Sequence, residues 1–450
     1  MQNKVKKYFL FLLLVCCRSF LTAQLPGMPA MALKEAKNVF GGADGEAAFS
    51  ITNTSDGGYA VTGYTVSNNG DVSGSHGSGD IWIVKFNVKG FIEWQKTLGG
   101  TNFETGFSII QTSDGGYAIA GETRSNNGDV SINKGKKDMW VVKLSSMGLI
   151  EWQKTLGGTE NEEAKSIIQS SDGGYVVAGW TGSNNGDVSG NHGGSDMWVV
   201  KLNGTGTILW EKILGETKDD GAFSIIQTTD GGYAVAGYTG LAIGYNAVPS
   251  DMWVVKLNAT GALEWQKTLG GSGNDEAHSI IQTGDGGYGM VGRTQSNNGD
   301  VSGNHGGFDI WVAKLNATGA LEWQKTLGGS NNDDGRSIIR TVDGGYIMIG
   351  STQSNDGDVS GNHGGFDIWV AKLNATGALE WQKTVGGTGY DEAYAATQMS
   401  NQVMTNGFIV AGTTASGNGD IAGPWNGNQE FFLPWLDASG NVIRLYEDVP

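Results

Sequence analysis

Cysteine is nearly absent from this chain. Among its 450 residues there are two cysteines, Cys16 and Cys17, and both lie in an N-terminal segment that ends at Ala23. If that segment is removed on export, the remaining chain has no cysteine. Disulfide bonds are then excluded as a source of stability, even in an oxidising compartment, and a large hydrophobic core has to replace them.

Long hydrophobic runs are also missing outside the N-terminus. The segment 1–23 begins with basic side chains at Lys4, Lys6 and Lys7, continues with a short apolar run from Tyr8 to Cys17, and ends in small residues before Gln24. This is the pattern of a secretory signal peptide. A lipoprotein alternative is disfavoured because Val15 and Cys16, which precede the two cysteines, are not the small residues that lipobox cleavage needs. No other run reaches the ~18 apolar residues of a membrane span, so we expect an exported chain without a membrane span, periplasmic, extracellular or at the cell surface.

Positive charge is scarce. The formal net charge is −17, and loss of the predicted signal peptide removes four cationic side chains and no acidic one, which leaves −21. Such a chain repels phosphate backbones and anionic lipid surfaces, which excludes nucleic acid as a partner. Cations, neutral glycans and basic proteins remain, and the charge also serves solubility outside the cell.

What the chain has in abundance is one repeated unit. The sequence Asp-Gly-Gly-Tyr begins at Asp56, Asp114, Asp172, Asp230, Asp285 and Asp343, and a degenerate copy begins at Thr405. The spacing is constant except for one shorter step, from Asp230 to Asp285. A fixed period of roughly 58 residues indicates a solenoid, a propeller or an array.

Each unit predicts four short strands. In the fifth unit they cover residues 275–283, 288–292, 309–315 and 321–327, with Gly/Asn/Asp turns or a long polar loop between them. No segment has sustained helical periodicity, which excludes helical solenoids. A β-helix is the structural alternative, but its rungs are usually shorter than this period. We therefore predict an all-β fold: a seven-bladed β-propeller with four antiparallel strands per blade, closed by a terminal strand.

The domain boundaries follow from the repeat. We expect a signal peptide at 1–23, an N-terminal segment with a closing strand at 24–42, and the propeller at 43–450, with blades at about 43–98, 101–156, 159–214, 217–269, 272–327, 330–385 and 388–447. Fourth-strand-like segments occur eight times, because Leu33 to Phe40 and Asn441 to Glu447 both have this pattern. One of the two ends should therefore close the ring and remove its exposed sheet edges.

Twelve of the fifteen tryptophans occupy two positions of the repeat. The third-strand positions are Trp82, Trp140, Trp198, Trp253, Trp311 and Trp369, and the fourth-strand positions are Trp94, Trp152, Trp210, Trp265, Trp323 and Trp381. Large aromatic side chains at fixed places suit packing between neighbouring blades. The functional alternative is a platform on which carbohydrate stacks.

The repeat resembles that of secreted bacterial β-propeller repeat proteins. The shared signature is Trp-Gln-Lys-Thr-Leu-Gly-Gly, then Asp/Glu-Ala-x-Ser-Ile-Ile-Gln-Thr, Asp-Gly-Gly-Tyr and Asp-x-Trp-Val-Val-Lys-Leu, from position 33 to about position 447. The resemblance implies the propeller architecture and an exported or surface protein, and it names no activity. The segment 315–323 also resembles the tryptophan-docking repeat of quinoprotein-like propellers, but this version is a residue shorter, and no cofactor-binding set carries over.

The repeat also predicts which loops carry function. The loops after the first and third strands are short, whereas those after the second and fourth strands are longer and polar and should share one face. A carboxylate stands at the start of every first strand: Glu46, Glu104, Glu162, Asp220, Asp275, Asp333 and Asp391. As channel-mouth carboxylates these residues would form a site for a cation or a basic peptide. The structural alternative is that they accept backbone N–H bonds.

The long loop carries a second repeated carboxylate, at Asp71, Asp129, Asp187, Asp300, Asp358 and Asp420. Asn and Asp oxygens around a Gly turn suit Ca²⁺, the one cofactor that the sequence suggests. The alternative is a network of Asx-turns. The fourth unit replaces the loop, so Tyr245 and Asn246 are candidates for an asymmetric ligand site. A later loop position holds His76, His192, His305 and His363, which we interpret as loop-ordering residues, since copies on separate blades cannot converge on zinc.

No catalytic motif is present: the chain has no nucleophile elbow, no metal-binding His-Glu motif and no phosphate loop. The sequence therefore predicts a monomeric, secreted or surface-associated binding or adhesion scaffold for a glycan or protein ligand, without catalytic residues. The alternative is a propeller enzyme, quinoprotein-like or polysaccharide-acting, with a site at the channel mouth.

Overall fold

The structure is a computed structural model that describes residues 32–241, 249–400 and 405–449. All regular elements in these ranges are β-strands. The described part of the chain includes no helix of the length and apolarity needed to cross a membrane. The predicted signal peptide and the pair Tyr245 and Asn246 lie outside the described residues.

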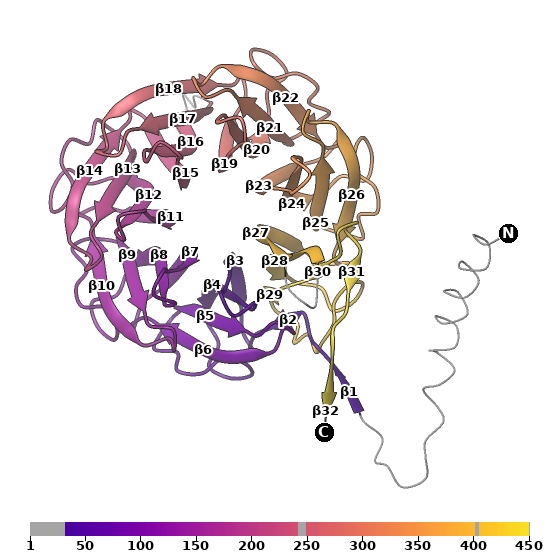
Figure 1. Ribbon diagram of the computed structural model, residues 1–450. Helices are drawn as coiled ribbons and strands as arrows, with labels where there is room; N and C mark the ends of the chain where they lie inside the picture. The colour runs from indigo at the N-terminus through magenta and orange to yellow at the C-terminus, as the bar shows by residue number, and fades with distance from the viewer. Residues whose placement is uncertain (1–31, 242–248, 401–404, 450) are drawn as a thin grey trace, which may run out of the picture. The chain divides into compact units, whose positions relative to one another are not determined.

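Seven antiparallel sheets stand around a ring, with the first strand of each sheet innermost (Figure 1). Blade 1 contains β3 (Glu46–Asn53), β4 (Tyr59–Thr65), β5 (Asp80–Phe86) and β6 (Ile92–Leu98); blade 2 contains β7 (Glu104–Gln111), β8 (Tyr117–Thr123), β9 (Asp138–Leu144) and β10 (Ile150–Leu156); blade 3 contains β11 (Glu162–Gln169), β12 (Tyr175–Thr181), β13 (Asp196–Leu202) and β14 (Ile208–Leu214). Blade 4 contains β15 (Asp219–Gln227), β16 (Tyr233–Leu241), β17 (Asp251–Leu257) and β18 (Leu263–Leu269); blade 5 contains β19 (Asp275–Gln282), β20 (Tyr288–Thr294), β21 (Asp309–Leu315) and β22 (Leu321–Leu327); blade 6 contains β23 (Asp333–Arg340), β24 (Tyr346–Thr352), β25 (Asp367–Leu373) and β26 (Leu379–Val385). The predicted seven-bladed β-propeller is confirmed.

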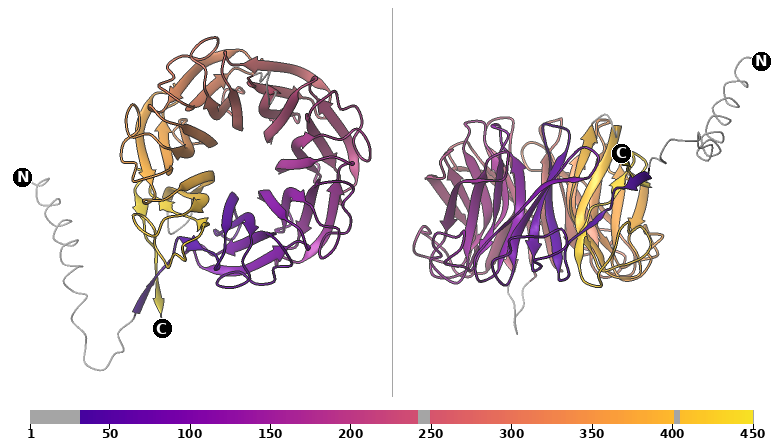
Figure 2. Two further views of the ribbon diagram at one scale, coloured as in Figure 1. Left: turned by 180° about the vertical axis from the view of Figure 1, so that it is seen from behind. Right: turned by 90° about the horizontal axis from the view of Figure 1, so that it is seen from below.

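The strands of the propeller run from one face of the ring to the other. The side view in Figure 2 shows the blades standing next to one another, with their connecting loops gathered at two opposite faces. Because every blade is antiparallel, the loops after its first and third strands reach one face, and the loops after its second and fourth strands reach the other.

The short turn after each first strand is fixed by its own side chains. In blade 2 the carboxylate of Asp114 accepts the N–H of Gly116 at 2.9 Å and the hydroxyl of Thr112 at 2.5 Å. Gly115 between them has a φ of 83°, a left-handed conformation that a side chain disfavours. Lys143, buried on β9, reaches the same carboxylate at 2.9 Å. The Asp-Gly-Gly motif therefore recurs in blades 1 to 6 because each of these blades uses this turn.

The hydrophobic core lies between neighbouring blades. The third-strand tryptophan Trp82 is fully buried, and its Nε1 donates to Gln95 on the next strand at 2.9 Å. The fourth-strand tryptophan Trp94 meets Tyr117 of the following blade edge-to-face, with ring centroids 5.5 Å apart. Both tryptophan positions are used for packing within and between blades, as the structural interpretation of the sequence predicts.

Blade 7 is assembled from both ends of the chain. Its inner strands are β27 (Asp391–Ser400) and β28 (Thr405–Thr414), and its third strand is divided into β29 (Glu430–Phe432) and β30 (Trp435–Leu436). The outermost position is divided as well: β2 (Val39–Phe40) pairs with β29, and β31 (Val442–Ile443) pairs with β30. The N-terminal and C-terminal segments of the chain therefore both close the ring, and each forms one half of the outermost strand of blade 7.

The predicted closing strand from Leu33 to Phe40 is therefore two strands. Residues 39–40 form β2 in the propeller, whereas β1 (Ala32–Glu35) pairs with β32 (Tyr446–Val449) in a separate two-stranded antiparallel ribbon. The ribbon forms a compact unit of its own, distinct from the unit that spans Lys37–Arg444.

Candidate functional site

A β-bulge interrupts the first strand of every blade near its middle. In blade 1 the pairing of β3 with β4 shifts between Ala48 and Ser50, so Phe49 lies in the bulge. A bulge re-aims a side chain and leaves the ladder locally broken. The hydroxyl of Ser50, beside this bulge, accepts the N–H of Ile109 on β7 of the next blade at 3.2 Å and so links the two inner strands. The same serine link joins four further pairs of blades.

The bulged residues of all seven blades line one cavity of about 180 Å³ in the central channel. We call them the collar: Phe49, Phe107, Lys165, Phe223, His278, Arg336 and Tyr394. The repeats agree closely on both sides of this position, yet the collar holds three phenylalanines, a tyrosine and three different basic residues. Packing within the blades does not constrain a residue that faces the channel, which leaves this position free to differ from blade to blade.

One side of the collar is aromatic. The rings of Tyr394 and Phe49 meet edge-to-face at 4.8 Å, and those of Phe49 and Phe107 are tilted at 5.5 Å. Beside them the ammonium group of Lys165 lies 3.6 Å from the centre of the Phe107 ring. The side chains of neighbouring blades are thus joined by aromatic and cation–π contacts across the channel wall.

The other side is an ion-pair network between blades 5 and 6. Both ring nitrogens of His278 face acceptors, the carbonyl of Gly335 at 2.7 Å and the carboxylate of Glu276 at 3.1 Å, which is the environment of a doubly protonated imidazole. Asp334 lies 3.3 Å from His278 and 2.6 Å from Arg336. Burial and Arg336 lower the pKa of His278, but Asp334 and Glu276 outweigh them and raise it. Burial raises the pKa of Glu276, whereas His278 and Arg293 lower it to about 2.

A second network lies between blades 2 and 3. Lys165 pairs with Glu163 at 2.9 Å, and Lys137 bridges Glu163 and Glu122, each at 2.6 Å. Burial and the neighbouring Glu163 raise the pKa of Glu122. Burial also acts on Glu163, but Lys165 and Lys137 outweigh it and hold the pKa of Glu163 below its usual range. Each basic collar residue is therefore held by a carboxylate on the same inner strand, two residues earlier.

The carboxylates that we predicted at the channel mouth are buried inside the blades. All seven are fully buried: Glu46, Glu104, Glu162, Asp220, Asp275, Asp333 and Asp391. Glu46 accepts the N–H of Gly42 at 2.9 Å and the hydroxyl of Thr65 at 2.8 Å, and the other blades repeat these bonds. This is the arrangement of the structural alternative, in which the carboxylate fixes the corner between two blades.

These carboxylates have a second buried carboxylate nearby, which sequence reasoning missed. At Gly157, the ideal position of a Cβ lies 2.4 Å from Glu162 Oε2 and 2.8 Å from Asp138 Oδ1. Asp138 begins a third strand, and its Oδ1 is buried without a hydrogen-bond partner. Burial, with the charge of Glu162 added, raises the pKa of Asp138 to about 6. Glu162 and Asp138 are therefore two neighbouring carboxyl groups buried in one blade corner, where burial and mutual repulsion disfavour the ionised form of Asp138.

The long-loop aspartates lie at the seams between blades. Asp71 Oδ2 accepts the N–H of Gly41 at 3.1 Å and pairs with Lys37, and Asp187 is held in the same way by Gly157 and Lys134. The structure does not bring the set together: Asp71, Asp129, Asp187, Asp300, Asp358 and Asp420 stand on different blades. No group of three or more potential metal-ligating side chains occurs among the described residues. Calcium binding stays a prediction.

The loop histidines are bound to their own loops. His76, His192, His305 and His363 each place Nδ1 near the aspartate four residues later, at 2.6–3.0 Å. The two long loops of a seam also touch, since Asn69 accepts the N–H of Ala43 at 2.7 Å. The loops after the second and fourth strands therefore share one face of the propeller.

No family model matches the chain. It is 26% identical over 419 residues to the regulatory protein FlaEY of Caulobacter vibrioides, an alignment that covers 81% of this chain and 41% of FlaEY. The chain thus spans less than half the length of this curated relative.

Several solved structures are similar to the chain at low identity. A protein of unknown function from Bacteroides caccae is 14% identical with a TM-score of 0.38, over 67% of this chain and 89% of that one. Sqt1 from Chaetomium thermophilum is 11% identical with a TM-score of 0.44, over 85% and 97% of the two chains. The Pan2 WD40 domain of Neurospora crassa is 10% identical with a TM-score of 0.42, over 77% and 89%.

Proposed function

We propose that this protein is an exported, monomeric binding scaffold that holds a glycan or protein ligand at its central channel and performs no catalysis on it. The collar carries the proposal. It is the place where seven otherwise similar blades present seven side chains of mixed chemistry to one cavity. A rigid scaffold that varies its exposed residues at one point is the usual design of a binding site.

The chemistry of the collar suits binding. Arg336 and Lys165 keep a third and a fifth of their side chains exposed, while the carboxylates that hold them, Asp334 and Glu163, are more deeply buried. The channel wall therefore offers ordered N–H donors beside aromatic rings, in side chains whose conformations are fixed before a ligand arrives. Such preorganisation reduces the entropy lost on binding.

Two further observations support the proposal. The segment 1–23 has the pattern of a signal peptide, which agrees with export to a surface or an extracellular space. The relative FlaEY is named as a regulatory protein, and a scaffold that binds without catalysis is one way to exert regulation.

The test compares the parent with a collar variant, Lys165→Ala combined with Arg336→Ala, on a glycan array and a panel of extracellular proteins. Lys154→Ala is the control, because Lys154 lies on β10 at the outer edge of blade 2. We expect a ligand that the parent and the control bind and the collar variant loses by tenfold or more, as for an ordered charged contact at ~1.5–3 kcal/mol. Turnover of the ligand, or equal binding by all three proteins, would refute the proposal.

A further inference from the structure

The seam between blades 6 and 7 differs from the other seams. In blades 1–6 the fourth strand is continuous, as in β26, but in blade 7 it is divided between β2 and β31. Pro434 stands between β29 and β30 and has no N–H to continue the ladder. A cavity of about 430 Å³ opens between β26 and β31. We call it the seam pocket.

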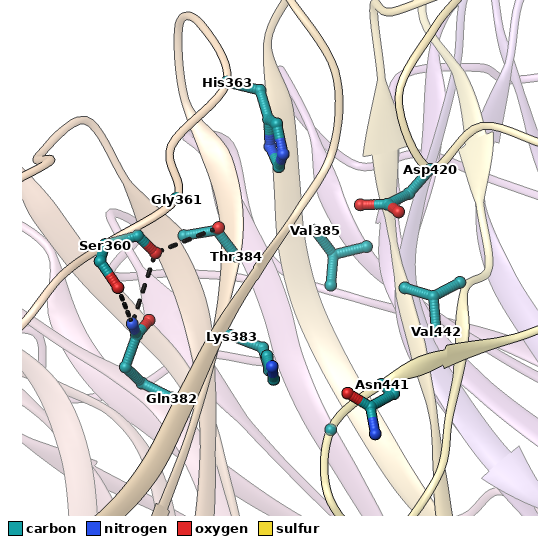
Figure 3. A pocket seen from close by; sticks show the side chains of 11 residues that line it. Ser360, Gly361, His363, Gln382, Lys383, Thr384, Val385, Asp420, Asn441 and Val442 are labelled. Carbon is teal, nitrogen blue, oxygen red and sulfur yellow. Dashed lines mark hydrogen bonds between the residues drawn. The ribbon is translucent and has the colours of Figure 1, made fainter.

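The two long walls of the seam pocket carry side chains of opposite character (Figure 3). His363 hangs from the long loop of blade 6, and its Nδ1 is bound to Asp367 at 2.6 Å, which leaves Nε2 for the cavity. Asp420 faces it from blade 7. One oxygen of Asp420 accepts the N–H of Gly386 at 3.2 Å, and the other has no hydrogen bond among the described residues. Asn38 fixes the backbone of Asp420 through a 3.0 Å bond to its carbonyl.

At two other seams the equivalent side chains contact one another, whereas His305 and Asp358 between blades 5 and 6 form no ion pair within 4 Å in the described structure. Lys134 forms an ion pair with Asp187 between blades 2 and 3, and His76 lies 3.7 Å from Asp129 between blades 1 and 2. The described structure contains no such ion pair within 4 Å between His363 and Asp420. The basic and the acidic side chain are thus held apart across an open cavity, where an intervening charged ligand can pair with both.

The floor of the seam pocket adds two polar groups and an apolar surface. Lys383 on β26 is exposed, and its ammonium group interacts electrostatically with the carboxylate of Asp437. The amide nitrogen of Asn441 donates to Asp437 at 3.1 Å, so its carbonyl oxygen is left for the cavity. Val385 and Val442 lie between this pair of polar groups and the pair formed by His363 and Asp420 (Figure 3).

We propose that the seam pocket binds a small zwitterion of the amino-acid type. The carboxylate of the ligand lies against Lys383 and His363, and its ammonium group lies against Asp420 and the carbonyl of Asn441. A short aliphatic side chain contacts the two valines. Each charged end of such a ligand meets a polar group that is not fully paired within the described structure, which is the condition for a favourable charged contact.

The test uses L-valine with two analogues that each lack one charge, 3-methylbutanoate and isobutylamine, in isothermal titration calorimetry on the full chain. We expect saturable binding of L-valine below about 10 mM and binding of each analogue at least about tenfold weaker. Absence of saturable binding of L-valine in that range, or equal binding of all three compounds, would overturn the proposal.

Two variants locate the site. Lys383→Gln should weaken L-valine binding about tenfold, whereas Lys325→Gln, at the same position of β22 in blade 5, should leave it unchanged because that seam has a continuous outer strand. Lys383 is exposed, so its substitution spares the fold. Binding that survives Lys383→Gln, or that falls equally in both variants, would place the ligand elsewhere and refute the seam pocket. Neither result depends on the collar.

Discussion

The indole of Trp152 on β10 lies against the α-carbon of Gly206 in the following blade. A Cβ built on Gly206 would lie 2.9 Å from Cε3 of the indole, and Trp152 Nε1 donates to the carbonyl of Gly204 in the same turn at 3.1 Å. The contact recurs at five further seams, where turn glycines meet fourth-strand tryptophans: Gly148 with Trp94, Gly261 with Trp210, Gly319 with Trp265, Gly377 with Trp323 and Gly440 with Trp381. Neighbouring blades are therefore locked by glycine and tryptophan together.

Replacing Gly206 by Ala should destabilise the propeller. The new methyl group meets the Trp152 ring, and the φ of +80° at this position is unfavourable for alanine. Overpacking and strain together predict a loss of about 2–4 kcal/mol in the free energy of unfolding, measured by urea denaturation. Gly173→Ala is the matched control, because Gly173 has a φ of +82° and no atom within 4 Å of its Cβ position. Its loss should be confined to about 1–2 kcal/mol. Equal losses would show that the indole contact contributes nothing.

The buried carboxylates predict an unusual dependence of stability on pH. Burial and the charges of Asp275 and Asp300 raise the pKa of Asp251 to about 6. A carboxyl group whose pKa is higher in the folded state contributes stability that is complete below the unfolded value, 3.8, and is lost as the pH rises through 6. Asp251→Asn cannot ionise. Relative to the parent, the variant should gain about 1–2 kcal/mol of unfolding free energy between pH 4 and pH 8, after allowance for solvent screening.

Asp230 in the same blade is the control, because its pKa is shifted in the opposite direction. Hydrogen bonds from Thr228 and the ion pair with Lys256 lower the pKa of Asp230 to about 2. Its stabilisation is present above the unfolded value and is lost as the pH falls through 2, so Asp230→Asn should cost stability at pH 7 and little at pH 2. Denaturant unfolding of the parent and the two variants across this range checks both signs. Parallel pH profiles for all three proteins would contradict the assignment.

Among Asp71, Asp187 and Asp300 of the long loops, Asp300 is the one at which we expect calcium to bind. Lys37 and Lys134 already pair with Asp71 and Asp187, whereas Asp300 has no cation beside it among the described residues. We expect that a rise of the melting temperature in Ca²⁺ over chelator depends on Asp300 and is lost in Asp300→Asn, while Asp187→Asn retains it. An unchanged melting temperature of the parent in millimolar Ca²⁺ would leave the Asx-turn network as the account of these loops.

The blades could be predicted from the sequence because their information is local and repeated. The segments 309–315 and 321–327 were predicted as strands, and they are β21 and β22 with the same bounds. Turn glycines, alternating strands and paired tryptophans recur in every unit, so each unit supports the interpretation of the others. Blade 7 was predicted less well. Its third strand is divided at Pro434, and the outer strands that pair with the two halves come from opposite ends of the chain, which no local pattern specifies.

The collar was missed for the opposite reason. A search for repeats finds residues that recur from unit to unit, whereas the residue type at the collar position changes. Phe49 and Lys165, for example, occupy equivalent positions. The signal was present as divergence within a nearly constant strand, but the bulge that turns this residue into the channel is visible only in the pairing register. The carboxylates at the strand starts recur because they fix the blade corners, so their recurrence indicated structure.

Ring closure by the N-terminal segment gives the last prediction. Val39 and Phe40 of β2 are buried, and the Phe40 ring meets Phe86 of blade 1 edge-to-face at 4.8 Å. Asn38 adds two hydrogen bonds to blade 7, at the carbonyl of Asp420 and the N–H of Ala422. Deleting residues 24–42 removes these contacts and exposes the edge of β29. Loss of two buried apolar side chains should cost about 3–6 kcal/mol and lower the melting temperature by several degrees, and the open edge should promote oligomers.

The control deletion ends before this segment. Removing residues 24–31 leaves Asn38, Val39 and Phe40 in place, so the melting temperature and the monomeric state should match those of the parent in differential scanning calorimetry and light scattering. Asn38→Ala separates the hydrogen bonds from the strand, with an expected loss of about 1–3 kcal/mol because Asp420 and Ala422 lose their partner in a buried place. If the longer deletion also stays monomeric and as stable as the parent, β31 alone closes the ring, and the pairing of β2 with β29 is dispensable.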